Sequence, residues 1–195
     1  MDKPIEAHLA AAHHLLRYIK AAPGKGLFFP AVSTLQLMSF SNSDWGACPD
    51  SRKSIFGYSV ILGDALISWK LKKQSNVSKS SSEAEYRALA LLTCEIQWLL
   101  YLLHDLFISH PSPALLFCDN QSAIQLAYNP IYYERTKHIE IDCHIIREKI
   151  QQGIITLLPV TSSNQLADCF TKPLPLSQFH ASTSKLGLHN LYAPA

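Results

Sequence analysis

The sequence predicts an α/β domain built on a five-stranded mixed sheet, and three observations lead to this class. Three strand patterns with short connections follow one another, which is typical of an antiparallel meander. A long amphipathic helix comes next, and short apolar runs then alternate with helices, as in parallel strands joined by crossovers. The chain has 195 residues, of which 48% are hydrophobic, so it can bury a core of its own.

The three strands of the meander follow a helix and a break. The helix is expected over residues 4–21, and it ends at Pro23, Gly24 and Gly26 because proline and glycine interrupt regular structure. Gly63 predicts a tight turn between the last two strands. The candidate strands are residues 35–43, 54–62 and 65–70.

The second half of the sheet is predicted from a helix and two apolar runs. Residues 80–106 carry apolar side chains every three or four positions, so one stripe of a long helix faces the core. Residues 114–118, Ala-Leu-Leu-Phe-Cys, are continuously apolar, which is typical of a strand buried on both faces. The stripe consists of Leu89, Leu92, Ile96, Leu99, Leu103 and Leu106. The other expected elements are helices over residues 120–128 and 138–151, a strand over 154–160, a short helix from Asn164 and a helix over 176–186.

The composition argues against several classes of protein. A net charge of +2 permits a phosphate-rich partner without requiring one. The five cysteines are odd in number and contain no C-x-x-C pair, so we expect free, buried thiols in a reducing compartment. We find no signal peptide, no membrane-spanning run of about 20 apolar residues and no glycine-rich phosphate-binding motif. We therefore expect an intracellular protein with no membrane partner and no small-molecule cofactor.

Two glutamates begin the long helix, and the helical period distinguishes them. Glu85 lies four residues before Leu89, on the apolar stripe, whereas Glu83 is rotated by about 120° from that stripe. We expect Glu83 to be a solvated acid, favoured by the positive end of the helix dipole. For Glu85 there are two interpretations. It is either a solvated acid of the same kind or a carboxylate that faces the sheet, which must then be paired, protonated or metal-bound.

Two aspartates follow strands of the predicted sheet. Asp119 comes directly after residues 114–118, and ligands gather beyond the carboxyl ends of parallel strands, although a helix N-cap explains an aspartate there equally well. Asp168 lies in the helix after the last strand, where a surface acid in a first turn is the ordinary interpretation. If these acids meet Glu85, they can hold two divalent ions about 4 Å apart that assist cleavage of a phosphodiester. Mg²⁺ or Mn²⁺ suits such oxygen ligands, and no histidine–cysteine cluster competes for zinc.

Five strings of the chain are specific enough to compare with a known family. They are SDWGACPDSRKSIFGYSVILGDALISWKLKKQ, VSKSSSEAEYRALA, FCDNQSAIQLAYNP, RTKHIEIDCHIIREKI and NQLADCFTKPL. In order and at fitting spacing, they resemble the ribonuclease H domain of copia-type retrotransposon Pol polyproteins. The leading string HLLRYIKAAPGKGLFF resembles the segment that joins reverse transcriptase to ribonuclease H in the same family. The resemblance implies the ribonuclease H-like fold, a five-stranded mixed sheet flanked by helices, and cleavage of the RNA strand of an RNA–DNA hybrid.

The resemblance also implies roles for single residues. Family members hold divalent metal ions with four acids, and Glu85, Asp119 and Asp168 match three of them. Gln121 matches a position that helps hold the hybrid in its minor groove, where contacts with 2′-hydroxyls distinguish RNA from DNA. The family reads Tyr-Ser-Asp-Ala-Asp-Trp where this chain reads Phe-Ser-Asn-Ser-Asp-Trp. Asn42 therefore stands at the position of the metal-bridging aspartate.

An asparagine at this position weakens the predicted site. Its amide is neutral and offers one oxygen, so a negative charge is lost where cations must converge. We expect metal affinity and turnover to fall severely. Asp44 lies on the same strand face but about 6–7 Å along the strand, and we do not expect it to replace the missing carboxylate.

Basic and aromatic residues give weaker indications of nucleic-acid binding. The lysines between the third strand and the long helix belong either to a solvated loop or to a patch that contacts the phosphates of a nucleic acid. In the second interpretation, Lys72 and Lys73 are the candidate nucleic-acid-binding residues. The four lysines are Lys70, Lys72, Lys73 and Lys79, and a similar, weaker group is Arg135, Lys137 and His138. We expect the tryptophans to pack in the core or on a sheet face, and they are Trp45, Trp69 and Trp98.

Two hypotheses of function, from different classes, follow. In the first, the chain is a ribonuclease H domain that works with the reverse transcriptase portion of a polyprotein, in a cytoplasmic retrotransposon particle or in the nucleus. In the second, it is a catalytically inactive transposon remnant that at most binds nucleic acid or polyprotein partners. The predicted organisation begins with a linker helix and strand over residues 1–33, which resembles the end of the reverse transcriptase and connection segment. The ribonuclease H-like domain follows over 34–175, and a C-terminal helix and tail over 176–195.

Overall fold

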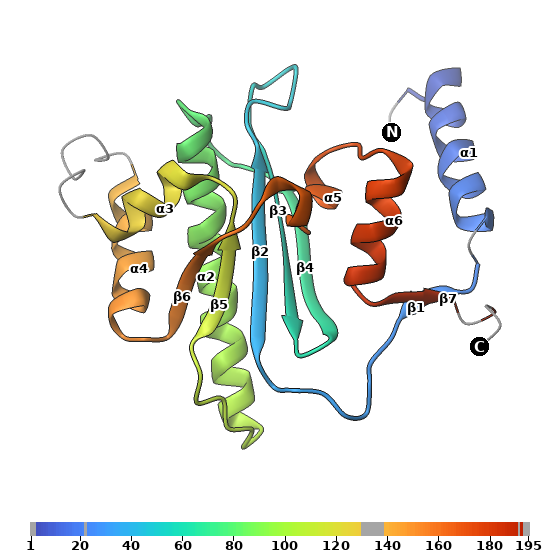
Figure 1. Cartoon of the computed structure of the whole chain (residues 1–195). Helices are drawn as coiled ribbons and strands as arrows, with labels where there is room; N and C mark the ends of the chain where they lie inside the picture. Colours follow the sequence, from blue (N-terminus) through green and yellow to red (C-terminus); the bar gives the residue numbers. More distant parts are fainter. Residues whose placement is uncertain (1–2, 22, 130–138, 191, 193–195) are drawn as a thin grey trace.

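The structure, a computed structural model, describes residues 3–21, 23–129, 139–190 and 192. The strands of its central sheet are β2 (Leu37–Asp44), β3 (Ile55–Leu62), β4 (Ala65–Lys73), β5 (Ala114–Cys118) and β6 (Ile155–Pro159). They are ordered β4-β3-β2-β5-β6 across the sheet (Figure 1). Neighbouring strands are antiparallel from β4 to β2 and parallel from β2 to β6. The predicted fold class, an antiparallel meander followed by parallel crossovers, is confirmed.

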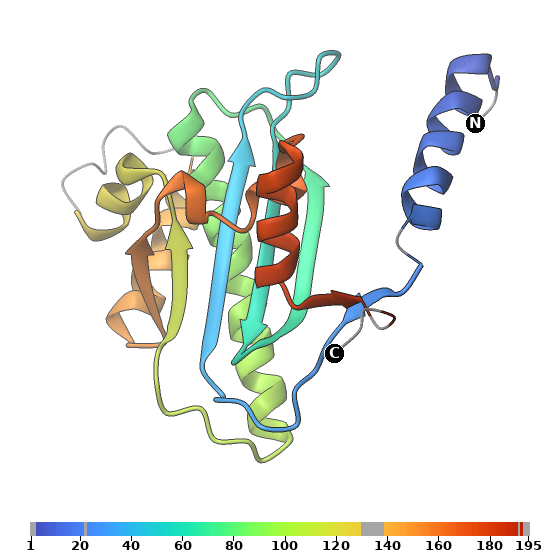
Figure 2. The same cartoon turned by 45° about the vertical axis from the view of Figure 1, so that its right-hand side comes forward.

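Helices cover both faces of this sheet (Figure 2). One face carries α2 (Ser81–Asp105), α3 (Gln121–Tyr128) and α4 (Glu140–Gln151). The other carries α5 (Asp168–Thr171) and α6 (Leu176–Lys185), which follow a short 3₁₀ turn, η3 (Ser162–Asn164). After β6 the chain therefore crosses to the face opposite the long helix.

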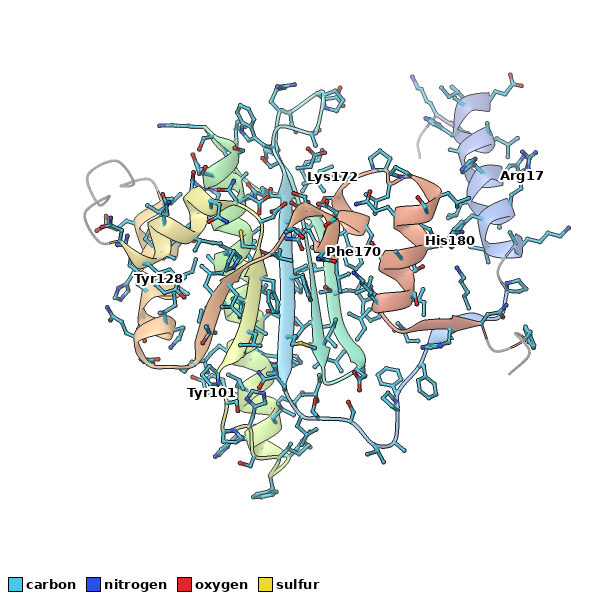
Figure 3. The ribbon with its side chains drawn as sticks, in the orientation of Figure 1. Arg17, Tyr101, Tyr128, Phe170, Lys172 and His180 are labelled. Atoms are coloured by element: carbon cyan, nitrogen blue, oxygen red, sulfur yellow. The ribbon has the colours of Figure 1, made fainter. Side chains whose placement is uncertain are left out.

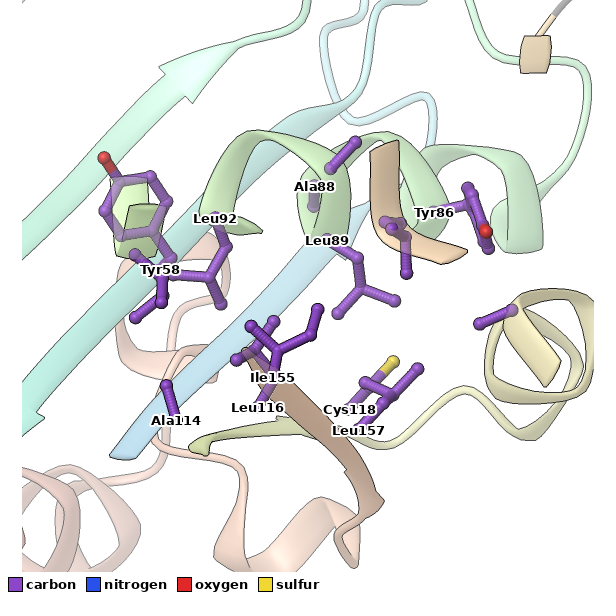
Figure 4. Packing of buried hydrophobic residues seen from close by; sticks show 14 of the residues in the cluster. Tyr58, Tyr86, Ala88, Leu89, Leu92, Ala114, Leu116, Cys118, Ile155 and Leu157 are labelled. Carbon is purple, nitrogen blue, oxygen red and sulfur yellow. The ribbon is translucent and has the colours of Figure 1, made fainter. Parts of the chain in front are cut away.

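The larger core lies between the sheet and α2. Leu89 and Leu92 of the helix are fully buried and belong to one cluster with Leu116 of β5 and Ile155 of β6 (Figure 4). The predicted apolar stripe is confirmed except at its end. Leu106 lies past the last turn of α2 and is exposed.

The two ends of the described chain meet beside the second face of the sheet. β1 (Lys25–Leu27) pairs with β7 (Leu188–Asn190) in an antiparallel two-stranded sheet. Leu27 and Leu188 pack against a smaller core that contains Leu166 of the η3–α5 segment. This pairing was not predicted, because strands of three residues carry no periodicity. The preceding helix, α1 (Glu6–Ala21), buries none of its residues, and the predicted domain boundaries remain a prediction.

Two expectations about side chains are only partly right. None of the three tryptophans lies in the core, but Trp69 on β4 lines a pocket with Phe170 of α5 and Phe179 of α6. All five cysteines are free, as predicted, but Cys94 is exposed and Cys169 is only partly buried. Within the described ranges, no helix combines the length and the apolar character that a bilayer crossing requires.

Candidate metal centre

The three predicted acids meet at one end of the sheet, where β2 and β5 stop. Glu85 lies near the start of α2, Asp119 follows β5, and Asp168 begins α5. The charges of Asp119 and Asp168 both act on the Glu85 carboxyl group. One ligand atom from each of Glu85, Cys118 and Asp119 lies within 4.8 Å of the others. Segments far apart in the chain thus bring three carboxylates to one place.

Asn42 lies beside these acids and is only 1% exposed. Phe40 pairs with Phe117 in the parallel register of β2 and β5, so Asn42, two residues further on, is level with Asp119. The amide nitrogen of Asn42 donates a hydrogen bond to the hydroxyl oxygen of Thr171 on α5. Asn42 therefore lies beside the strand that precedes Asp119 and is bonded to the helix that begins with Asp168.

Glu85 is 5% exposed and is about as buried as Asp168, at 4%. Its Oε1 atom accepts a 2.8 Å hydrogen bond from the backbone amide of Ser43, but its buried Oε2 atom has no hydrogen-bond partner among the described residues. Burial raises the pKa of Glu85 to about 8, and the charges of Asp119 and Asp168 act in the same direction, against the Ser43 hydrogen bond and the charge of Lys172. A buried carboxylate oxygen without a donor calls for a proton or a cation.

The atoms present fit a hard divalent cation. Carboxylate oxygens are the ligands that Mg²⁺ and Mn²⁺ prefer, and half-buried Asp119 leaves the cluster open on one side. Cys118 adds a soft sulfur atom to the group of Glu85 and Asp119. Burial raises the pKa of its thiol well above the usual range, so the sulfur stays protonated and is a poor ligand. The donor set therefore favours an oxygen-liganded ion over zinc.

Gly57 allows α5 to approach the sheet. It pairs with Asn42 across β2 and β3. A Cβ atom at this position would lie 2.7 Å from Phe170 Cβ and 3.1 Å from Thr171 Cγ2, closer than packed atoms tolerate. The position of Asp168, at the start of the same helix, therefore depends on this glycine. The signal in the sequence was a glycine inside a strand, which often marks a close backbone approach.

Lys172 was not predicted from the sequence, and it belongs to the site. Its Nζ atom lies 2.8 Å from Asp168 Oδ1, four residues earlier. Burial lowers the pKa of Lys172, but the hydrogen bond to Asp168 and the charges of Asp168, Asp119 and Glu85 outweigh it and raise that pKa. The sequence could have indicated this ion pair, because an acid and a lysine four residues apart lie next to each other on a helix.

The helix-cap alternative for Asp119 is wrong. Asn120 caps α3 instead, because its side-chain oxygen accepts a hydrogen bond from the amide of Ala123. Asp119 receives a long hydrogen bond of 3.4 Å from the hydroxyl of Ser162, which leaves its carboxylate available. Asp168 is not a surface acid, since its side chain is only 6% exposed.

The expectation for Glu83 is also wrong, because this residue is buried. Ser80 accepts a hydrogen bond from the amide of Glu83, and Glu83 accepts one of 2.8 Å from the amide of Lys79. Its carboxylate also pairs with Arg87 at 3.0 Å. The arrangement is close to a capping box, in which the acid folds back over the helix start instead of extending into water. Glu83 thus stabilises the helix that carries Glu85.

The candidate nucleic-acid residues lie on the surface. Gln121 is the exposed first residue of α3. Lys72 and Lys73 are exposed at the end of β4 and line a groove with Arg87. Lys73 also contacts Cys48, with 3.0 Å between Nζ and Sγ. Asp44 ends β2 and is half-buried, whereas the group Arg135, Lys137 and His138 lies outside the described residues.

The sequence of the chain is similar to those of retrovirus-related Pol polyproteins from plants. No protein-family model matches the chain. The chain is 42% identical over 188 residues to the retrovirus-related Pol polyprotein from transposon RE1 of Arabidopsis thaliana, which covers 96% of this chain and 13% of that protein. It is 33% identical over 190 residues to the retrovirus-related Pol polyprotein from transposon TNT 1-94 of Nicotiana tabacum, which covers 97% of this chain and 14% of that protein. The chain therefore spans only a small part of the length of these relatives.

Among the solved structures that match the chain is the N-terminal RNase H domain of rv2228c from Mycobacterium tuberculosis, at 11% sequence identity and a TM-score of 0.49. The match covers 77% of this chain and 98% of that chain.

Proposed function

Because the chain belongs to the retrovirus-related Pol polyproteins of copia-type transposons, as a ribonuclease H-like domain, we propose that it binds RNA–DNA hybrids and cleaves their RNA strand. The cleavage depends on divalent metal ions and is severely slowed by Asn42. One observation carries the proposal: the buried Oε2 atom of Glu85 has no donor among the described residues, although the charges of Asp119 and Asp168 act on the same carboxyl group.

The proposed cofactor is Mg²⁺, or Mn²⁺ in its place. Glu85, Asp119 and Asp168 would hold it, and the bound ion would lower the pKa of a coordinated water and neutralise charge on the phosphate. The chain itself supplies the positions of these ligands. The backbone amide of Ser43 holds one oxygen of Glu85, and Gly57 lets the helix with Asp168 approach.

The hybrid is proposed to run across the end of the sheet that carries the acids. Ile55 pairs with Asp44 on one side and with Lys73 on the other, so Lys72 and Lys73 lie at the same end of the sheet as Asn42. Their ammonium groups would contact phosphates. Gln121 is exposed two residues after Asp119 and would reach the minor groove, where 2′-hydroxyls identify the RNA strand.

A second candidate function is binding without cleavage, and Asn42 favours it. A neutral amide replaces a carboxylate at the buried position beside the other acids. The cluster then has less charge to hold cations, while the lysines and Gln121 that would contact the hybrid are unaffected. In this function the chain is a remnant that recognises nucleic acid but no longer cuts it.

A labelled RNA–DNA hybrid tests the proposal on the full chain. Electrophoretic mobility shift measures binding, and gel analysis of the RNA strand with Mg²⁺ or Mn²⁺ measures cleavage. Slow cleavage that disappears in Glu85→Gln, while binding remains, supports the first function. Binding with no cleavage in the unmodified chain selects the second. A chain that binds the hybrid no better than duplex DNA contradicts both.

The partner and the place of action belong to the same proposal. The relatives extend far beyond the segment that matches this chain. We propose that the domain works beside the reverse transcriptase portion of a polyprotein, in a cytoplasmic retrotransposon particle or in the nucleus. Co-purification of this chain with that portion, expressed separately, would test the partnership.

A further inference from the structure

The acid cluster already contains one positive charge. The Lys172 ammonium lies 2.8 Å from Asp168 Oδ1 and interacts with the charges of Asp119 and Glu85. Figure 3 shows Lys172 beside α5, near one end of the central sheet. The Asp168 side chain is 6% exposed and that of Lys172 is 40% exposed. The lysine therefore reaches a buried carboxylate from the solvent side of the cluster.

The backbone holds Lys172 in this place. α5 is four residues long, and the amide of Lys172 donates a 2.9 Å hydrogen bond to the carbonyl of Asp168, which closes the helix. The preceding residue, Thr171, accepts the hydrogen bond from Asn42. Neighbouring residues of one short helix thus contact both the degenerate position and the last acid.

The charges decide how many cations the cluster can hold. Two divalent ions carry four positive charges, which four carboxylates would balance. Asn42 removes one carboxylate, and Lys172 offsets another. Once an ion has displaced the proton of Glu85, three carboxylates and one ammonium leave two net negative charges, which a single divalent ion neutralises. A second ion would approach an ammonium that is already hydrogen-bonded to Asp168, and the repulsion would be strong in a partly buried site.

We propose that the Lys172 ammonium takes the place of one of the two cations at this cluster, so that the site binds a single divalent ion. This inference rests on the proposed function only in requiring that the acids bind a divalent cation. Lys172 acts here as a positioning residue for the metal ligands. Since part of its side chain faces solvent, it competes with a cation for Asp168 and does not close the site.

Counting bound ions tests the inference without any measurement of activity. The full chain is titrated with Mn²⁺, and the signal of free Mn²⁺ in electron paramagnetic resonance gives the stoichiometry and the affinity. We expect one ion per chain. In Lys172→Met we expect a second ion, or at least about tenfold tighter binding of the first, because the competing charge is gone. Lys172→Arg keeps the charge and should bind one ion.

The controls separate this inference from the proposed function. Lys185→Met removes an exposed lysine that is bonded to Asn164 outside the cluster, and it should leave the titration unchanged. Two ions in the unmodified chain, or identical titrations of the unmodified chain and Lys172→Met, would overturn the inference while the metal site stands. Absence of Mn²⁺ binding in every variant, Asn42→Asp included, would overturn the metal site itself. Circular dichroism verifies folding, and Lys172→Gln replaces Lys172→Met if the latter does not fold.

Discussion

Asn42 on β2 donates a hydrogen bond to Thr171 on α5, across 129 positions of the chain. The contact joins the strand that lacks its expected carboxylate to the helix that supplies Asp168. A threonine hydroxyl can donate as well as accept. It can therefore bond a carboxylate at position 42 as readily as it bonds the amide.

The first prediction concerns the replacement of this amide by a carboxylate. Asn42→Asp should fold normally, since the Thr171 hydroxyl would donate to the new carboxylate. The fourth acid should raise Mg²⁺-dependent cleavage of an RNA–DNA hybrid on the order of 100-fold or more, because loss of even supporting groups around a metal costs about 10- to 100-fold. Cleavage rates at saturating Mg²⁺ measure this effect.

A matched control adds the same charge close by. Asn120→Asp keeps the cap of α3, because aspartate caps helices as well as asparagine does, and it should change cleavage little. Equal activity of Asn42→Asp and the unmodified chain would show that the amide is not what limits this site.

The second prediction concerns the pH dependence of stability in the absence of metal. The pKa of Glu85 is raised from an ordinary value of 4.5 to about 8, so the folded chain binds this proton more tightly than the unfolded chain does. The free energy of unfolding should therefore fall as pH rises from about 4.5 to about 8, and then level off. Glu85→Gln should abolish this fall and be more stable than the unmodified chain above pH 8, by a few kcal/mol.

Urea unfolding with EDTA, between acid and alkaline pH, measures this dependence. Adding Mn²⁺ at alkaline pH should stabilise the unmodified chain, because the ion replaces the proton on Glu85, but should not stabilise Glu85→Gln to the same extent. Glu148→Gln, which changes an exposed acid on α4, is the control and should leave the fall in place. A flat pH profile for the unmodified chain would refute the assignment of a buried, uncompensated carboxyl.

The third prediction concerns the approach of α5. Gly57→Ala places a Cβ atom against Phe170 and Thr171 and should push the helix away from β3. We expect a loss of about 1–3 kcal/mol in the free energy of unfolding, the usual range for overpacking, together with weaker Mn²⁺ binding because Asp168 moves with the helix. Thermal or urea unfolding and Mn²⁺ titration give the two quantities.

Gly26→Ala is the matched control for this substitution. No atom lies within 4 Å of a Cβ built at Gly26, so the change should be within about 0.5 kcal/mol of neutral. If Gly57→Ala is as stable as Gly26→Ala, then α5 is not packed as closely as the structure describes.

The fourth prediction concerns the lysines at the end of β4. Lys72→Gln with Lys73→Gln should weaken hybrid binding and reduce the slope of log affinity against log salt by about 2, roughly one for each phosphate that a lysine no longer neutralises. Lys72→Gln alone should cost more than Lys73→Gln, because the Lys73 ammonium already contacts Cys48. Fluorescence anisotropy over a range of salt concentrations measures both slopes.

A lysine far from this patch calibrates the effect. Lys20 lies exposed in the last turn of α1, and Lys20→Gln should leave the salt dependence unchanged. An unchanged slope in the double variant would place the path of the hybrid elsewhere on the molecule.

Local patterns determined much of this protein. The period of three and four in α2 predicted which of its faces is buried. The same period placed Glu85 on the side that faces the sheet, but it wrongly left Glu83 in solvent, since both glutamates are buried. The run Ala114–Cys118 predicted a strand of the parallel part of the sheet with the bounds that the structure has, although only one of its two faces is fully buried. Each of these inferences needed only neighbours within a few turns or one strand, where spacing in sequence fixes direction in space.

Contacts between distant segments were decided only by the tertiary structure. The role of Gly57 under α5 and the place of Lys172 beside Asp119 and Glu85 depend on chain segments that no local period relates. Asn42 was notable in the sequence as a departure from a family pattern, but its partner Thr171 was not foreseeable. The reason is physical: periodicity specifies which way a side chain points, whereas the charge and space that it meets there depend on how the elements pack.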